Sequence, residues 1–168
     1  MNKKQKGFSL IELLIVVAII LIIAAIAIPN LLRARMAANE SSAVGTVRTL
    51  VTSEVTYSST WNTGFSDTLA HLGGTAVPCV ASSTSACLID PLIAAGGPKS
   101  GYFVAAVGGT PVNGVISTFG VSAYPVTQGT TGTRTFCSDE SGVVRVDVTG
   151  AVMATPTDTG CAAFPSLQ

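Results

Sequence analysis

The stretch from Lys6 to Ile28 reads KGFSLIELLIVVAIILIIAAIAI, and it decides how the rest of the chain is interpreted. A short basic leader precedes an apolar run that starts at Phe8 and contains one ionisable side chain, Glu12. At roughly 1.5 Å per residue, a helix over residues 8–28 is about 31 Å long, which matches a hydrocarbon core of about 30 Å. The sequence therefore predicts a helix that can span a membrane.

Glu12 is the residue of this helix that needs an explanation. On insertion scales, a carboxylate at the bilayer centre costs roughly 2.5–3.5 kcal/mol, and less near an interface. A charge retained at such a cost commonly has a partner or a function. Glu12 is therefore the first candidate functional residue.

The hexapeptide Gly7-Phe8-Ser9-Leu10-Ile11-Glu12 resembles the cleavage and methylation motif of type IV prepilins and type II secretion pseudopilins. The resemblance covers residues 1–35 of 168. It implies that a prepilin peptidase removes the leader, residues 1–7, by cutting between Gly7 and Phe8, and that Phe8 is then N-methylated. It also implies that an inner-membrane assembly platform builds the subunits into a homo-oligomeric helical filament.

The charges around the cut fit this resemblance. After cleavage, the amine of Phe8 lies at a helix N-terminus, where a positive charge opposes the helix dipole, while Glu12 one turn later has the favourable sign. If the amine of an arriving subunit lies beside Glu12 of a neighbour, two charges poorly solvated by lipid neutralise each other, and the contact fixes the axial register. The resemblance implies this assembly role for the matching glutamate. The simpler alternative is that Glu12 snorkels to the interface or guides the peptidase and methylase.

Two other interpretations use the same residues. In the first, the leader lysines and the apolar run form a secretory signal that is cut near Ala25-Ile26-Ala27, which leaves an exported soluble periplasmic domain. In the second, the run is an uncleaved membrane anchor with the lysines as positive-inside determinants. Glu12, and Gly7 placed before the apolar run, argue against a plain signal. All three interpretations place the leader in the cytoplasm and the remainder outside.

Pro29 follows the apolar run and predicts a kink or local melting of the helix, because proline lacks an N–H and clashes with the preceding turn. Residues 29–60 then predict an amphipathic helix with a narrow apolar face, formed by Ala37, Val44, Val47, Val51 and Val55. Gly45 and several Thr and Ser residues lower the helix propensity of this segment. We therefore expect it to pack against a globular head.

Residues 61–168 have the size of one small domain and predict this head. Residues 61–100 lose periodicity and are rich in Ser, Thr, Gly and Pro, which predicts a long loop. Strand patterns separated by short glycine-containing turns follow at residues 102–107, 115–124, 134–137 and 143–148. The expected fold class is α+β and pilin-like: a long N-terminal helix, its apolar half protruding, packed on a four-stranded antiparallel sheet.

All four cysteines lie in the part expected to be exported, where an even number favours two disulfides. Of the three connectivities, Cys79–Cys87 and Cys137–Cys161 are favoured because each closes a local loop. The second would tie the C-terminal segment to the sheet, as the C-terminal disulfide loop does in many type IV pilins.

No residue pattern predicts catalysis, a cofactor or a metal. His71 is the single histidine, it lies in a loop without a recognisable nucleophile motif, and no C-x₂-C spacing is present. Asp139-Glu140-Ser141-Gly142 fits an acidic turn between strands better than a calcium site. Removal of the three leader lysines (9 − 3 = 6 basic against 9 acidic side chains) leaves a formal charge of −3, which does not favour nucleic acid as a partner.

The expected function is that of a structural subunit of a type IV pilus, without enzymatic activity. The subunit would first lie in the lipid of the inner membrane with its N-terminus cytoplasmic and its head periplasmic, and then in a filament at the cell surface. The nearest alternative is a major pseudopilin of a type II secretion system, which would form a short periplasmic piston. The two cysteine pairs favour the pilin, whereas calcium in the last loops would favour the pseudopilin.

Overall fold

The computed structural model describes residues 8–74 and 78–167, without the side chains of residues 158 and 159. The chain divides into two compact units, Met1–Arg35 and Met36–Gln168, and helix α1 (Leu10–Trp61) contributes residues to both. We refer to the second unit as the head. Gly7 and the rest of the expected leader lie outside the described residues.

The part of α1 within the head is amphipathic. Its buried side chains recur at three- and four-residue intervals: Glu40, Ala43, Val47, Leu50, Ser53, Glu54 and Tyr57. The hydroxyls on its other faces donate to backbone carbonyls one turn earlier, as Thr46 does to Ser42 at 3.0 Å and Thr56 to Thr52 at 2.8 Å. Burial of one face of this segment therefore stabilises a helix whose intrinsic propensity is mediocre, as the sequence predicts.

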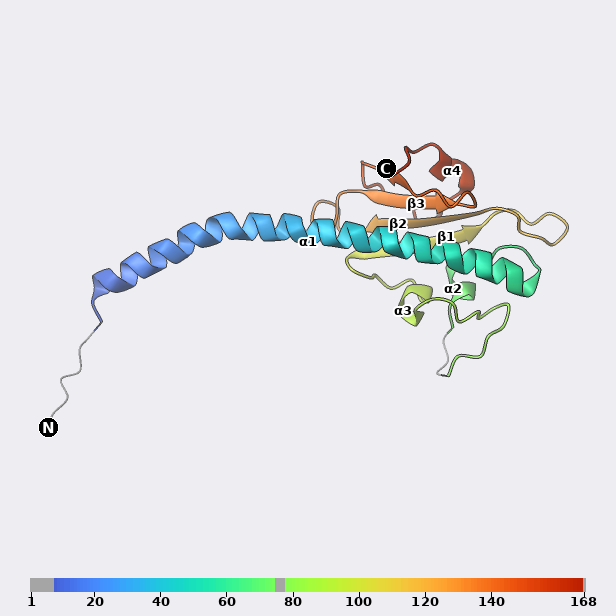
Figure 1. Cartoon of the computed structure of the whole chain (residues 1–168), viewed down its shortest axis with the longest axis horizontal. Helices are drawn as coiled ribbons and strands as arrows, with labels where there is room; N and C mark the ends of the chain where they lie inside the picture. The colour runs from blue at the N-terminus through green and yellow to red at the C-terminus, as the bar shows by residue number, and fades with distance from the viewer. Residues whose placement is uncertain (1–7, 75–77, 168) are drawn as a thin grey trace. The chain divides into compact units, whose positions relative to one another are not determined.

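The head contains one antiparallel four-stranded sheet in which the strands follow chain order (Figure 1). Its strands are β1 (Tyr102–Gly108), β2 (Phe119–Pro125), β3 (Thr135–Asp139) and β4 (Arg145–Asp147). In the longest ladder Tyr102 is opposite Pro125 and Gly108 is opposite Phe119. This meander confirms the predicted α+β architecture.

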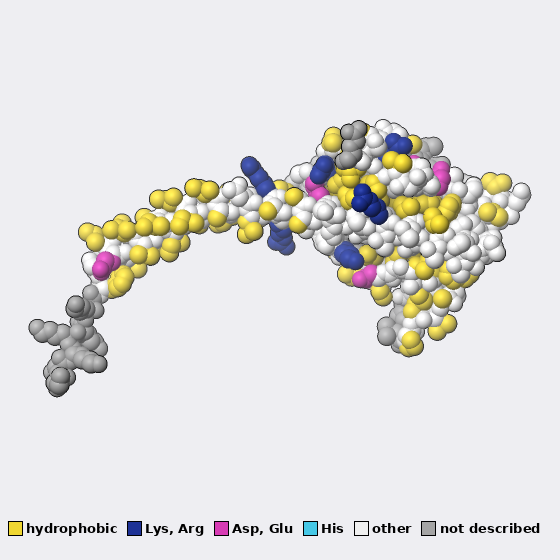
Figure 2. Space-filling model, viewed as in Figure 1, with side chains coloured by type: hydrophobic (Ala, Val, Ile, Leu, Met, Phe, Trp, Pro, Cys, Tyr) yellow, Lys and Arg dark blue, Asp and Glu magenta, His cyan; other side chains and the backbone are white. Residues whose placement is uncertain are grey.

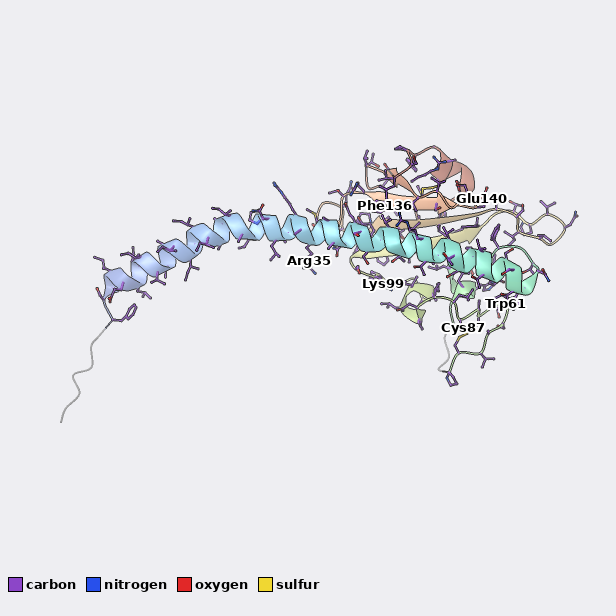
Figure 3. The ribbon with its side chains drawn as sticks, in the orientation of Figure 1. Arg35, Trp61, Cys87, Lys99, Phe136 and Glu140 are labelled. Carbon is purple, nitrogen blue, oxygen red and sulfur yellow. A yellow bond between two sulfur atoms is a disulfide. The ribbon has the colours of Figure 1, made fainter. Side chains whose placement is uncertain are left out.

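The core of the head lies between α1 and the sheet. Val47 and Leu50 of α1 are 0% and 1% exposed, and they belong to one apolar cluster with the rings of Tyr102, Phe119 and Phe136. Figure 3 labels Phe136 of β3 and Trp61 at the end of α1. The ring centroids of Tyr57 and Trp61 lie 4.9 Å apart, and both side chains contact the cluster. These two aromatic side chains therefore close the end of the helix against the head.

Two expectations from the sequence need correction. The predicted long loop contains two four-residue helices, α2 (Leu69–Leu72) and α3 (Pro91–Ala94), and a third short helix, α4 (Asp158–Ala162), lies near the C-terminus. Helix α3 begins because Asp90 accepts a hydrogen bond from the Leu92 N–H at 2.8 Å and Pro91 occupies the first helical position.

The second predicted strand, residues 115–124, begins four residues late in the structure (119 − 115 = 4). Residues 115–118 instead form one side of a hairpin whose tip is the tight turn Val112-Asn113-Gly114-Val115. Asn113 and Gly114 have φ values of 52° and 79°, the left-handed pair that a type I′ turn requires. Sequence pattern alone does not separate this hairpin from the strand that follows it.

Candidate functional site

The first turn of α1 contains a reciprocal pair of side-chain caps. Ser9 precedes the first helical residue, Leu10, and its hydroxyl accepts from the Ile11 N–H at 3.4 Å. The carboxylate of Glu12 accepts from the Ser9 N–H at 2.9 Å. These contacts satisfy two of the backbone donors that a helix N-terminus leaves free, and they form a capping box.

The capping box gives Glu12 a role within its own subunit that the sequence reasoning missed. The signal was present, because Ser9-Leu10-Ile11-Glu12 matches the S-x-x-E pattern before an apolar run. Only Oε2 of Glu12 takes part in this hydrogen bond, so its other oxygen is free to accept from a second donor. Phe8 lies just outside the helix and is 75% exposed.

The first unit of the chain exposes nearly all of its apolar side chains. From Phe8 to Arg35 every side chain is exposed except that of Ala24, which is half-buried. Figure 2 shows hydrophobic side chains along this part of the helix. Of the helices in the described residues, α1 is the one long and apolar enough to cross a membrane. Such a surface is stable in lipid or against other protein, and not in water.

Pro29 lies within α1, and the helix is continuous across it. The kink predicted at this position remains a prediction, whereas the structure contains no break in the helix between residues 25 and 29.

Glu40 fixes the beginning of the head segment of α1 to the loop that precedes β3. It is 7% exposed, and its Oε1 accepts from the N–H and the hydroxyl of Thr133, each at 2.9 Å. Its Oε2 accepts from the guanidinium of Arg134 at 2.9 and 2.6 Å. Burial alone raises the pKa of Glu40, but the hydrogen bonds from Thr133 and Arg134 and the charge of Arg134 outweigh it, so the pKa lies below its ordinary value.

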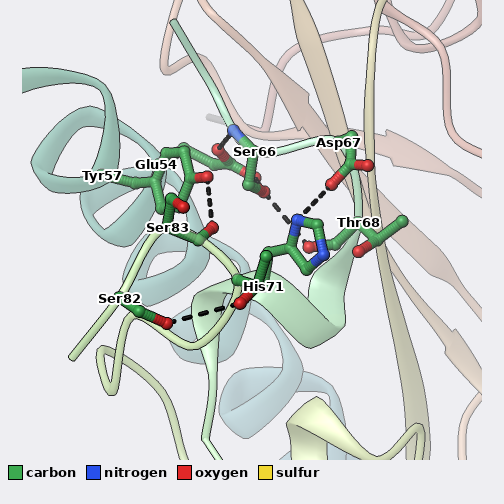
Figure 4. Close-up of polar contacts among 9 residues, drawn as sticks. Glu54, Tyr57, Ser66, Asp67, Thr68, His71, Ser82 and Ser83 are labelled. Atoms are coloured by element: carbon green, nitrogen blue, oxygen red, sulfur yellow. Dashed lines mark hydrogen bonds and ion pairs between the residues drawn. The ribbon is translucent and has the colours of Figure 1, made fainter. Parts of the chain in front are cut away.

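Glu54 lies about four turns further along α1, and no side-chain cation is bonded to it among the described residues. It is 0% exposed and accepts from the N–H and the hydroxyl of Ser66 at 2.8 and 2.7 Å (Figure 4). Burial raises the pKa of this carboxyl above its ordinary value, and the hydrogen bonds from Ser66 only partly offset that effect. Glu54 therefore acts as an acceptor that holds the segment after α1 against the helix.

His71 lies beside this cluster, with its Nδ1 2.5 Å from a carboxylate oxygen of Asp67 (Figure 4). Both side chains line a hollow of about 380 Å³, together with Tyr57 and Ser83. The Tyr57 hydroxyl donates to the Ser83 carbonyl at 2.6 Å, which ties a surface loop to the end of α1. Within the described residues, no serine or cysteine side chain is bonded to His71, so this pair lacks the geometry of a nucleophile and its base.

Two disulfides link the pairs that local loop closure favours. Cys79 is bonded to Cys87 and Cys137 to Cys161, with Cα atoms 6.1 and 5.8 Å apart. The second bond joins β3 to α4 and thereby holds the C-terminal segment on the sheet. In the β3–β4 turn, Asp139 accepts from the Ser141 N–H at 3.0 Å, so its carboxylate caps its own turn.

Comparisons with known proteins match the first unit. Residues 2–28 match the family model described as the prokaryotic N-terminal methylation motif. Over 39 residues, 23% of this chain, the sequence is 64% identical to the type IV wide pilus major component of Thermus thermophilus. Over 56 residues, 33% of this chain, it is 45% identical to the type IV major pilin protein of Myxococcus xanthus.

The matched segments span 30% and 26% of the lengths of these two relatives. No solved structure matches the chain. The likeness therefore lies in the N-terminal segment, and the head is described by its own structure. The chain therefore has the N-terminal methylation motif and an N-terminal segment similar to those of type IV pilins, followed by a pilin-like arrangement of a long apolar helix and an antiparallel sheet.

Proposed function

We propose that this chain is the structural subunit of a type IV pilus. A prepilin peptidase removes residues 1–7 by cutting between Gly7 and Phe8, Phe8 is N-methylated, and the subunits polymerise through the helices of residues 8–28. The observation that carries this proposal is the exposed apolar surface of α1, which begins one turn from a single carboxylate, Glu12.

The apolar surface of residues 8–28 must be covered, and two partners cover it one after the other. Before assembly, lipid covers residues 8–28 and an inner-membrane platform receives the subunit. After assembly, the same side chains pack against identical helices of other copies, because identical chains in a helical array bury the same surface repeatedly. Ordinary dissolved monomers would leave Leu10, Leu31 and the residues between them in water, at 78% and 68% exposure for these two.

Glu12 serves twice in this mechanism. In the single subunit it completes the capping box with Ser9. In the filament its free oxygen accepts from the Phe8 amine of a neighbour, so two charges in an apolar environment neutralise each other. Because that contact exists at one axial offset, it sets the register between copies.

The pilus is favoured over the secretion pseudopilus because both relatives named above are pilus components. Two disulfides in the head also suit a fibre at the cell surface, where no reducing system cleaves them.

The test of processing is the mass of the intact chain from its native host, with sequencing of its N-terminal peptide. A chain that begins with Phe8 and carries one added methyl group supports the proposal. A chain that begins at Ile28, or that retains residues 1–7 in fibres, would contradict it.

The test of assembly compares Glu12→Gln with Glu12→Ala. Glutamine keeps the acceptor for the Ser9 N–H and removes the charge, so it separates the capping box from the pairing. We expect both variants to insert into the membrane and both to lose most of their fibres. If Glu12→Gln makes normal fibres while Glu12→Ala does not, the function of Glu12 is capping and the pairing is wrong.

A further inference from the structure

The apolar part of α1 ends at a pair of arginines. Leu31 and Leu32 are 68% and 53% exposed, and Arg33 and Arg35 follow them in the same unit of the chain. Figure 2 shows Lys or Arg side chains that project from two sides of the helix just after its hydrophobic part. At about 3.6 residues per turn, two positions correspond to a rotation of about 200°, so the two guanidinium groups lie on opposite sides of the helix.

Neither arginine has an anionic partner within the described residues. Both side chains are exposed, and the ion pairs found there are those of His71 with Asp67 and of Arg134 with Glu40. Glu40 is the first acidic residue after the two arginines, and both of its oxygens already accept hydrogen bonds from the loop that precedes β3. Two guanidinium groups at the end of an apolar surface are therefore free to bind an anion outside the chain.

The charged residues of α1 delimit a segment that matches the thickness of a membrane. Between Glu12 and Arg33 lie 20 residues without an ionisable side chain (33 − 12 − 1 = 20), and Asn30, close to the arginines, is the one polar side chain among them. At about 1.5 Å per residue this segment is about 30 Å long, as is a hydrocarbon core. A span over residues 13–32 therefore places Glu12 at one interface and the arginines at the other, with no charge between them.

The headgroup layer of a bilayer supplies an anion that arginine binds well. Each phospholipid headgroup contains a phosphate diester, and a guanidinium group can donate two parallel hydrogen bonds to the oxygens of one phosphate. The apolar stem of arginine can lie along the acyl chains while its charged end reaches the headgroups. Because Arg33 and Arg35 leave the helix on opposite sides, they can bind two different lipids.

We propose that Arg33 and Arg35 bind phospholipid phosphates at the periplasmic face of the inner membrane. These contacts fix the lipid-covered segment of α1 at residues 13–32 before assembly, so the span ends at Leu32 instead of Ile28. This inference rests on the proposed function, which places the subunit in that membrane. It keeps Glu12 near the cytoplasmic interface, where its charge costs less, until a neighbouring copy pairs with it.

The charge of the leader agrees with this assignment. Basic residues favour the cytoplasmic side of a membrane during insertion. The leader contains Lys3, Lys4 and Lys6, whereas two arginines follow the apolar run, so the larger positive charge is on the side expected to be cytoplasmic. Once the leader is removed, Arg33 and Arg35 are the basic side chains nearest to the span in the sequence.

The test is solid-state NMR of the full chain in vesicles of phosphatidylethanolamine and phosphatidylglycerol, in a buffer without phosphate. The guanidinium carbon of arginine is labelled with ¹³C, and dephasing of its signal by ³¹P reports which arginines lie against a phosphate. The leader lysines carry no label and do not contribute to the signal. The chain has five arginines: Arg33, Arg35, Arg48, Arg134 and Arg145.

We expect phosphorus to dephase the signal of two of these five arginines. The double variant Arg33→Gln with Arg35→Gln should lose this dephasing, because glutamine is a good helix former and carries no charge. Arg48→Gln is the matched control. Arg48 is exposed on the same helix, 13 residues or about 20 Å beyond Arg35 (48 − 35 = 13), so its removal should leave the dephasing unchanged. Melting of the detergent-solubilised subunit checks that each variant is folded.

The reactivity of single thiols locates the end of the span in the same vesicles. Leu31 and Ala38 are both exposed in the structure, and the four cysteines of the chain are paired in disulfides. Maleimide reacts with the thiolate, which forms in water and not in hydrocarbon. We therefore expect Leu31→Cys to react roughly tenfold more slowly than Ala38→Cys.

Equal dephasing in the double variant and in Arg48→Gln, or equal reactivity of Leu31→Cys and Ala38→Cys, would overturn the inference. Dephasing by inorganic phosphate added to vesicles of a phosphate-free galactolipid would show a site for soluble phosphate, and would overturn it as well.

Two results separate this inference from the proposed function. If the chain begins with Phe8 and forms fibres, but no arginine lies against phosphorus, the proposed function stands and this inference alone is wrong. If the contact with phosphate is found but the chain forms no fibres in its native host, the membrane contact stands and the proposed function is wrong. A chain that begins at Ile28 would contradict both.

Discussion

The apolar side chains of helix α1 are exposed in the first unit of the chain and buried in the head. Leu14, in the first unit, is 60% exposed, whereas Leu50, in the head, is 1% exposed. Residues 8–28 are apolar on every side, so no single face can be buried by one sheet. In the head the apolar face is narrow, and the sheet of the same chain covers it. The difference teaches that the second part is stable by itself, while the first part depends on lipid or on other copies.

The largest expected effect is on the stability of the head, and it tests the difference between the two parts of α1 directly. Leu50→Ala should lower the free energy of unfolding of the head by about 4 kcal/mol, because it opens a cavity in a packed core. Leu14→Ala should change it by less than about 0.5 kcal/mol, because that side chain is exposed and belongs to the other unit of the chain. Urea unfolding of the full chain in detergent, followed by the fluorescence of Trp61, measures both values. Similar losses in the two variants would refute the division.

The two disulfides sharpen the comparison within the head. Replacement of Cys137 and Cys161 by alanine should cost about 3.5 kcal/mol, and the same change at Cys79 and Cys87 about 2.6 kcal/mol, because the longer loop constrains the unfolded chain more. Thermal unfolding of both double variants in detergent tests the order. The reverse order would mean that native contacts around Cys79–Cys87, and not loop length, dominate.

Two buried carboxylates of α1 should respond to pH in opposite directions. The pKa of Glu40 is lowered, so the unfolded chain takes up its proton first, and stability falls as the pH drops below the ordinary value of 4.5 through the folded pKa. The pKa of Glu54 is raised, so the folded chain takes up its proton first, and stability falls as the pH rises above 4.5 through the folded pKa.

Glutamine variants separate the two effects. Glu40→Gln should cost about 1.5 kcal/mol at neutral pH, because Arg134 loses a charged acceptor in a partly solvated pair. Glu54→Gln should cost less and should flatten the pH dependence above 4.5, since an amide still bonds to both groups of Ser66. Unfolding curves between pH 3 and pH 8 measure both. A pH profile unchanged by Glu54→Gln would assign the slope to another group.

The smallest expected effect concerns the first turn of α1. Ser9→Ala removes the acceptor for the Ile11 N–H and should weaken the first turn by about 0.5–1 kcal/mol, whereas Ser9→Thr should retain it. Amide hydrogen exchange of the full chain in detergent reports this at Ile11 with little change in the head. Unchanged exchange in Ser9→Ala would show that Glu12 alone caps the helix.

The parts of the fold predicted well are those with local signals. The length of the apolar run, the glycine-containing turns before and after the strands, and the spacing of the cysteines each depend on residues close in sequence. The features that the sequence did not predict depend on residues far apart in the chain or on very short patterns. The hydrogen-bonded ion pair of Glu40 and Arg134, for example, joins residues separated by 94 positions. The short helices α2 and α3 were missed because four residues give no periodicity.

The sequence by itself determined the long apolar helix with its motif at residues 7–12, the strand order of the sheet and the favoured pairing of cysteines, because local periodicity, turn residues and loop closure act within short segments. Tertiary structure alone decided that Glu40 is paired with a guanidinium while Glu54 is buried against a serine. Which side chains are buried, and which groups they pair with, depends on how segments distant in the sequence pack together. No single stretch of sequence specifies this.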